Sequence, residues 1–117
     1  MNKAIGKHLL VSSTLLVIEV YRCFIRLTRD HQISNNEFAL LIGQLKSDIE
    51  DINFQPLDLT LSMDPAFPVV SLPKAADLVH LKTALYFQHK FSDVLFLSCD
   101  VQQCKAAEEM GLVTIEF

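Results

Sequence analysis

Two apolar runs near the end of the chain, separated by a short helical segment, constrain the fold more than any other feature. Residues Val94–Ser98 form an apolar run of the kind that is buried in parallel sheets. Val101–Met110 has the pattern of a helix ended by Gly111, and Leu112–Glu116 has the pattern of a strand. Two strands joined by a connection of this length indicate a right-handed βαβ unit. We therefore predict an α/β fold with a parallel sheet.

The first long helix is predicted to follow a cluster of hydroxyl side chains. Ser12, Ser13 or Thr14 can cap it, because a side-chain oxygen there accepts hydrogen bonds from the first unpaired N–H groups of the helix. The helix should run to about Arg29 and be largely buried, since it is apolar on most sides. The preceding segment, Leu9–Val11, is either a short strand or the approach to this helix.

A second helix is predicted to begin at a capping box. Ser34 stands at the cap, and Glu37 reaches back to it from the third helical position. This helix should extend to about Ile52. The four prolines that follow make residues 54–73 mainly loop, so that a helix around residues 58–63 must be short. Residues 74–90 are predicted to form a further helix.

Length and composition indicate a folded chain of one domain, residues 1–117. Half of the residues are apolar and 21% are charged, which is typical of globular proteins. The longest apolar run is too short and too polar to span a bilayer. The three cysteines lack the spacing of a metal site and should be reduced and mostly buried. We expect a cytoplasmic protein that does not bind membranes.

Charge is distributed unevenly along the sequence. The net charge is −4, yet residues 1–31 carry an excess of three positive charges and residues 32–64 an excess of five negative charges. Arg22, Arg26 and Arg29 recur at helical spacing on the first long helix. Such a stripe suits the binding of an RNA phosphate backbone. An ordinary solvated helix face explains the same charges at least as well.

Three acids stand where apolar packing or helix capping is otherwise expected. Asp77 lies in the first turn of its helix, where the helix dipole favours negative charge. Asp100 follows an apolar strand, where it can cap the next helix or bind a ligand at the end of the sheet. Glu19 can pair with Arg22, but its apolar neighbours predict a half-buried position. His80, one turn after Asp77, either orients this acid or simply packs. Acids in such positions suit Mg²⁺, which prefers oxygen ligands.

Three parts of the sequence are similar to the motifs of PIN-domain proteins. Val11–Arg22 reads serine, apolar stretch, glutamate, apolar pair, arginine. Leu72–Leu85 contains an acid followed three residues later by histidine. Phe96–Asp100 and Ala106–Val113 together resemble the closing pattern of the family, a strand, an aspartate and a helix with alanine, glycine and leucine. Within the family, the chain resembles the VapC-type toxin nucleases of bacteria.

This resemblance implies a PIN-like, three-layer α/β fold and an endoribonuclease that cuts RNA with Mg²⁺ or Mn²⁺. By motif, Glu19, Asp77 and Asp100 would be the catalytic and metal-binding acids, with Ser98 and His80 in supporting positions. RNA would be the substrate, and an antitoxin protein would be a further partner. The competing hypothesis is a catalytically inactive PIN-like module that serves in binding or dimerisation.

One departure from the family concerns the start of the sequence. Family members begin with a central strand that carries an aspartate followed by threonine or serine, whereas residues 1–11 contain no acid. We therefore expect a domain that lacks its N-terminal strand and has impaired activity. An inner strand edge without its neighbour invites pairing with another chain, so we also expect a homodimer with two-fold symmetry.

Overall fold

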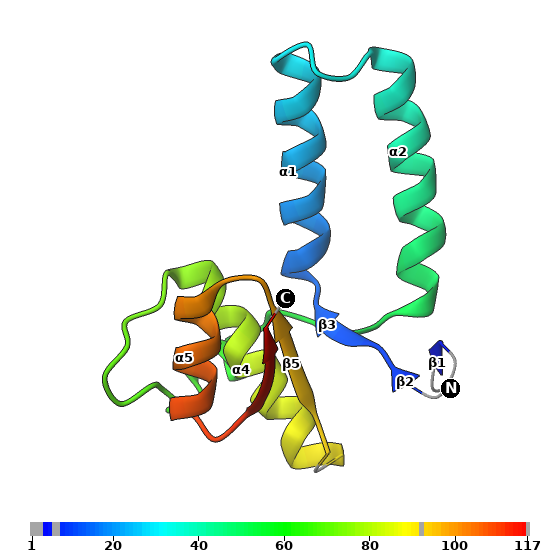
Figure 1. Ribbon diagram of the computed structural model, residues 1–117. Helices are drawn as coiled ribbons and strands as arrows, with labels where there is room; N and C mark the ends of the chain where they lie inside the picture. Colours follow the sequence, from blue (N-terminus) through cyan, green and yellow to red (C-terminus); the bar gives the residue numbers. More distant parts are fainter. Residues whose placement is uncertain (1–3, 6–7, 92, 117) are drawn as a thin grey trace. The chain divides into compact units, whose positions relative to one another are not determined.

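The structure is a computed structural model that describes residues 4–5, 8–91 and 93–116 (Figure 1). These residues form a mixed α/β structure with short parallel strands, so the predicted α/β class is confirmed. The chain divides into two compact units, Met1–Gln55 and Pro56–Phe117. The prediction of one domain over residues 1–117 stays a prediction.

Two helices dominate the first unit and follow the predicted bounds closely. They are α1 (Leu15–Arg29) and α2 (Asn35–Asp48), and the short 3-10 helix η1 (Ile49–Asp51) extends α2. The predicted capping box begins α2, since Glu37 N donates to Ser34 Oγ at 3.1 Å and Ser34 N donates to Glu37 Oε1 at 3.0 Å. Two reciprocal hydrogen bonds therefore fix the start of α2 from local sequence alone.

The prediction that α1 is largely buried is wrong. None of its residues is buried, and the side chains of Ile18 and Ile25 are 66% and 49% exposed. The two helices of this unit lie side by side (Figure 1), and the ring of Tyr21 meets that of Phe38 edge to face at 5.9 Å. One helix covers only one side of its neighbour, so apolar residues on the far side of α1 are left exposed.

Short strands precede and follow this helix pair. Strands β1 (Ala4–Ile5) and β2 (His8–Leu9) pair antiparallel, and these described residues contain no acid. Strand β3 (Val11–Ser13) pairs in parallel with β4 (Asn53–Gln55). The segment Leu9–Val11, predicted as a strand or as the approach to α1, is divided: Leu9 ends β2, Val11 begins β3, and Leu10 between them belongs to neither. Strand β4 was not predicted, because residues 53–55 are extended only through pairing with β3, some forty residues earlier in the chain.

The second unit contains the predicted short helix, the long helix and the closing strand–helix–strand segment. Its elements are α3 (Leu59–Met63), α4 (Ala75–Phe91), β5 (Leu95–Ser98), α5 (Val101–Glu109) and β6 (Val113–Glu116). Strands β5 and β6 are parallel, with a register that runs from Leu95 opposite Val113 to Ser98 opposite Glu116. Gly111, at φ +86°, lies in the turn between α5 and β6, a conformation that few other residues adopt without strain. The βαβ connection expected from the sequence is thus present.

The core of the second unit lies between α4, α5 and the two parallel strands. Leu81 of α4 is fully buried, as are two alanines of α5. The small alanine side chains let α5 approach its neighbours closely. The buried residues of this core are Leu81, Ala84, Leu85, Phe96, Ala106, Ala107 and Leu112.

The expectation that the apolar run of β5 is buried is met by only part of the strand. Phe96 is 9% exposed and belongs to the core, whereas Leu95 and Leu97 are 49% and 52% exposed. Successive side chains of a strand point to opposite faces, so one face of β5 meets the helices while the other faces outward. The apolar run predicted the strand, but its burial depended on which neighbours cover each face.

Candidate functional site

Asp100 occupies the position where the apolar strand ends and the next helix begins. It is the N-cap of α5, and its Oδ1 accepts hydrogen bonds from Gln102 N at 2.9 Å and Gln103 N at 3.4 Å. Both hydrogen bonds use Oδ1, so the second carboxylate oxygen takes no part in the cap. The capping role considered from the sequence is therefore real, and it leaves one oxygen for another task.

Ser98 holds the loop that carries Asp100. Its hydroxyl accepts a hydrogen bond from Asp100 N at 3.0 Å and donates one to Gln103 Oε1 at 2.8 Å. Ser98 thus connects the end of β5 with the first turn of α5 on both sides of Asp100. This geometry fixes the aspartate backbone, and the supporting role of Ser98 in a metal site stays a prediction.

Asp77 and Asp100 line the same hollow in the second unit. Asp77 lies in the first turn of α4, as predicted, and is half-buried, while Asp100 is exposed at the start of α5. The hollow has a volume of about 410 Å³, within the range of small-molecule sites. It is lined by Ser71, Leu72, Pro73, Lys74, Asp77, Asp100, Gln102 and Gln103. Two of the three acids that the sequence singled out therefore line one hollow.

Glu19 belongs to the other unit. It lies in α1 and is half-buried, as predicted from its apolar neighbours. The structure describes the two units separately, so the convergence of Glu19 with Asp77 and Asp100 stays a prediction. Within the described residues, no three side chains of histidine, cysteine, aspartate or glutamate are grouped as in a metal site. Mg²⁺ is often held by one or two carboxylates together with waters and substrate oxygens, so a role of Asp77 and Asp100 in holding this ion stays a prediction.

The remaining predicted residues are placed as the sequence suggested, without a demonstrated role. His80 is half-buried in α4, one turn after Asp77, and its orienting role stays a prediction. The α1 arginine stripe, Arg22, Arg26 and Arg29, is exposed to solvent. Arg29 Nε lies 3.2 Å from Asp30 Oδ1, and both side chains are well exposed, so this ion pair contributes little to stability.

Glu109 was not predicted as a site residue, yet it holds one wall of the hollow. Its Oε1 accepts hydrogen bonds from Val70 N at 2.6 Å and Ser71 N at 3.0 Å, and its Oε2 accepts one from Ser71 Oγ. The hydrogen bonds from the hydroxyl and backbone N–H of Ser71, and from Val70 N, lower the pKa of Glu109. Nothing local in the sequence indicates this contact, because its two sides are 38 and 39 residues apart.

Lys74, Gln102 and Gln103 were also missed as residues of the site. Each has a signal in the sequence, since Lys74 comes three residues before Asp77 and the two glutamines follow Asp100 within three residues. These residues lie beside the two acids at the starts of α4 and α5 and line the same hollow. Only the acids and their supporting residues were predicted, and these neighbours could have been added by the same reasoning.

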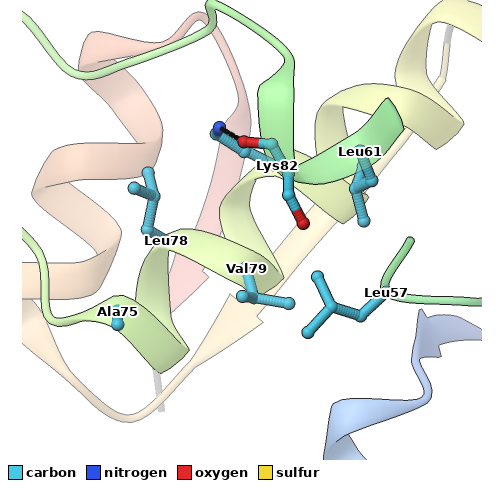
Figure 2. A pocket seen from close by; sticks show the side chains of 7 residues that line it. Leu57, Leu61, Ala75, Leu78, Val79 and Lys82 are labelled. Atoms are coloured by element: carbon cyan, nitrogen blue, oxygen red, sulfur yellow. Dashed lines mark hydrogen bonds between the residues drawn. The ribbon is translucent and has the colours of Figure 1, made fainter. Parts of the chain in front are cut away.

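A second, smaller hollow lies between α3 and the first half of α4 (Figure 2). Its volume is about 140 Å³, and Leu57 and Val79 point toward one another across it. Lys82 Nζ donates to the carbonyl oxygen of Ser62 at 2.9 Å at its edge. The other lining residues are Leu61, Ala75 and Leu78. With aliphatic walls and no acid among these lining residues, this hollow does not suit a metal ion.

The cysteines differ in part from the prediction. All three are free thiols, as expected, but Cys23 and Cys99 are exposed, and only Cys104 is buried. The expectation of mostly buried thiols is therefore wrong. Cys23 lies on α1, whose sides are more exposed than predicted, and Cys99 lies in the loop between β5 and α5.

Comparison of the chain with protein-family models, with characterised proteins and with solved structures finds no match. In the part of the chain that the structure describes, no helix has the length and apolar character needed to cross a membrane.

Proposed function

We propose that the chain is a PIN-like, divalent-metal-dependent endoribonuclease that cuts RNA phosphodiester bonds. The observation that carries the proposal is the meeting of Asp77 and Asp100 at one hollow of about 410 Å³. They come from the first turns of two different helices. Together with the motif resemblance, this arrangement favours a site that holds Mg²⁺ or Mn²⁺, with Glu19 as a third acid and the PIN-like sheet as its scaffold.

The residues of the hollow have distinct tasks in this proposal. A bound Mg²⁺ or Mn²⁺ would activate a water and stabilise the charge that develops on the phosphate. Asp77 and Asp100 would bind the ion through their carboxylates. The cap hydrogen bonds to Asp100 Oδ1 and the Ser98 hydroxyl hold the Asp100 carboxylate in one orientation. The exposed α1 arginine stripe would bind the phosphate backbone of the RNA.

The decisive experiment measures metal binding and RNA cleavage with matched variants. Asp77→Asn and Asp100→Asn remove charge with little change of shape, so both should weaken Mn²⁺ binding in calorimetry and abolish Mn²⁺-dependent cleavage of single-stranded RNA. The control is Asp93→Asn, because Asp93 is exposed before β5, at the opposite end of the strand from Asp100. A wild-type chain that neither binds Mn²⁺ nor cleaves RNA, or variants that behave like the control, would refute the proposal.

A second candidate function is the catalytically inactive binding or dimerisation module. The observation that favours it is the outward face of the β5–β6 pair, where Leu95, Leu97, Val113 and Ile115 are between 42% and 60% exposed. Parallel strands are normally covered on both faces, so a second copy of the chain or an antitoxin protein is a suitable cover. The mass of the protein in solution distinguishes a homodimer from a monomer, and Leu97→Asp should dissociate a dimer that uses this face.

A further inference from the structure

The segment Ser71–Lys74 forms one wall of the hollow that contains Asp77 and Asp100. Glu109 fixes the start of this wall through its hydrogen bonds with Val70 and Ser71. Glu109 is the last residue of α5, and Asp100 caps the first turn of the same helix. Helix α5 therefore positions Asp100 beside its first residue and, through Glu109 at its last residue, holds the start of the Ser71–Lys74 segment.

Lys74 ends this wall and carries a positive charge into a site with two negative ones. It is exposed, and it alone is cationic among the described residues that line the hollow. Its backbone carbonyl accepts a hydrogen bond from Leu78 N at 2.9 Å, which fixes Lys74 at the start of α4. This main-chain hydrogen bond fixes the backbone of Lys74 beside the hollow that its side chain helps to line.

We propose that Lys74 binds a phosphate group of single-stranded RNA beside Asp77 and Asp100, and that Glu109 positions the segment carrying Lys74. This inference rests on the proposed function insofar as it takes RNA as the ligand. Two carboxylates repel a phosphate, and the lysine that lines the same hollow supplies an attraction for the phosphate. Lys74 thereby differs from the α1 arginine stripe, which belongs to the other unit and does not line the hollow.

The test measures the binding of a fluorescent single-stranded RNA oligonucleotide in EDTA over a series of salt concentrations. Metal-free conditions prevent cleavage and make the result independent of ion binding. Lys74→Met should weaken binding about fivefold at low salt and reduce the salt slope by about 0.7, the value expected when one phosphate of a single strand is no longer neutralised. Lys74→Arg should keep the slope. The matched control is Lys90→Met, about 24 Å away along α4.

Further measurements separate this inference from the proposed function. An oligonucleotide with a neutral methylphosphonate backbone should bind wild type and Lys74→Met equally. Glu109→Ala removes both acceptor oxygens, so it should shift RNA binding in the same direction as Lys74→Met while leaving Mn²⁺ binding unchanged, as a positioning role requires. A Lys74-dependent slope in a chain that does not cleave RNA supports this inference and refutes the proposed reaction. If the chain cleaves RNA, but Lys74→Met and Lys90→Met have the same salt slope of RNA binding, the inference about Lys74 alone is refuted. The inference is also refuted if the wild-type chain does not bind the oligonucleotide.

Discussion

Asp100 has both a structural task and a proposed chemical task, and two substitutions can separate them. Asp100→Ala removes the cap hydrogen bonds to Gln102 N and Gln103 N together with the charge. Asp100→Asn removes the charge but keeps an oxygen that can accept the same hydrogen bonds, and asparagine is as good a cap as aspartate. The two variants should therefore differ in stability and agree in metal binding.

The expected magnitudes follow from the cap geometry. Loss of an N-cap side chain costs about 1 kcal/mol of unfolding free energy, so Asp100→Ala should be destabilised by about this amount. Asp100→Asn loses only the interaction of the charge with the dipole of α5, about 0.3 kcal/mol for an exposed group. Unfolding in urea, followed by circular dichroism, measures both values. Loss of the cap hydrogen bonds of α5 should thus account for most of the stability difference between wild type and Asp100→Ala.

Metal binding completes the test of Asp100. Calorimetric titration with Mn²⁺ should show that both variants have a reduced affinity, because neither carries the carboxylate charge. If Asp100→Asn keeps wild-type Mn²⁺ affinity, Asp100 is a helix cap and nothing more, and the proposed metal site is wrong. If Asp100→Asn is as unstable as Asp100→Ala, the cap needs more than an oxygen acceptor, and the reasoning from its hydrogen bonds is refuted.

Three further changes test other parts of the structure. Leu81→Ala, at a fully buried position, should lower the unfolding free energy by about 3 kcal/mol in a urea titration. The control Leu40→Ala, at a position 74% exposed, should change the unfolding free energy by less than about 0.5 kcal/mol. Equal effects of the two substitutions would contradict the packing of α4. Because hydrogen bonds lower the pKa of Glu109 below its ordinary value of 4.5, its stabilising contribution is present at neutral pH and is lost as the pH falls through the lowered pKa. Glu109→Gln should therefore lose less stability than wild type as the pH falls from 7 to below the lowered pKa of Glu109, and parallel pH profiles would contradict this role. Replacing the three arginines of the α1 arginine stripe with alanine should reduce the salt slope of RNA binding by about 0.7 for each phosphate that the stripe no longer neutralises; an unchanged slope would make the stripe an ordinary solvated face.

Local signals in the sequence determined where most helices and strands begin and end. The capping box at Ser34, the proline-rich segment before α4 and the glycine after α5 each act through neighbouring backbone atoms, so they are legible without knowledge of the fold. The strand–helix–strand pattern at the end of the chain likewise indicated the parallel β5–β6 pair. The position of Asp100 between a strand and the next helix was also predicted correctly, because the apolar run before it and the helical pattern after it are both local.

The tertiary structure alone decided which faces are buried and which residues share the hollow. An apolar run specifies a strand, but whether Leu95 and Leu97 are covered depends on neighbours that the run does not encode. Strand β4 depends on pairing with a segment far earlier in the chain. The wall held by Glu109 depends on hydrogen bonds to residues 38 and 39 positions away. Such contacts arise only when the chain has folded, because no local backbone preference brings their two sides together.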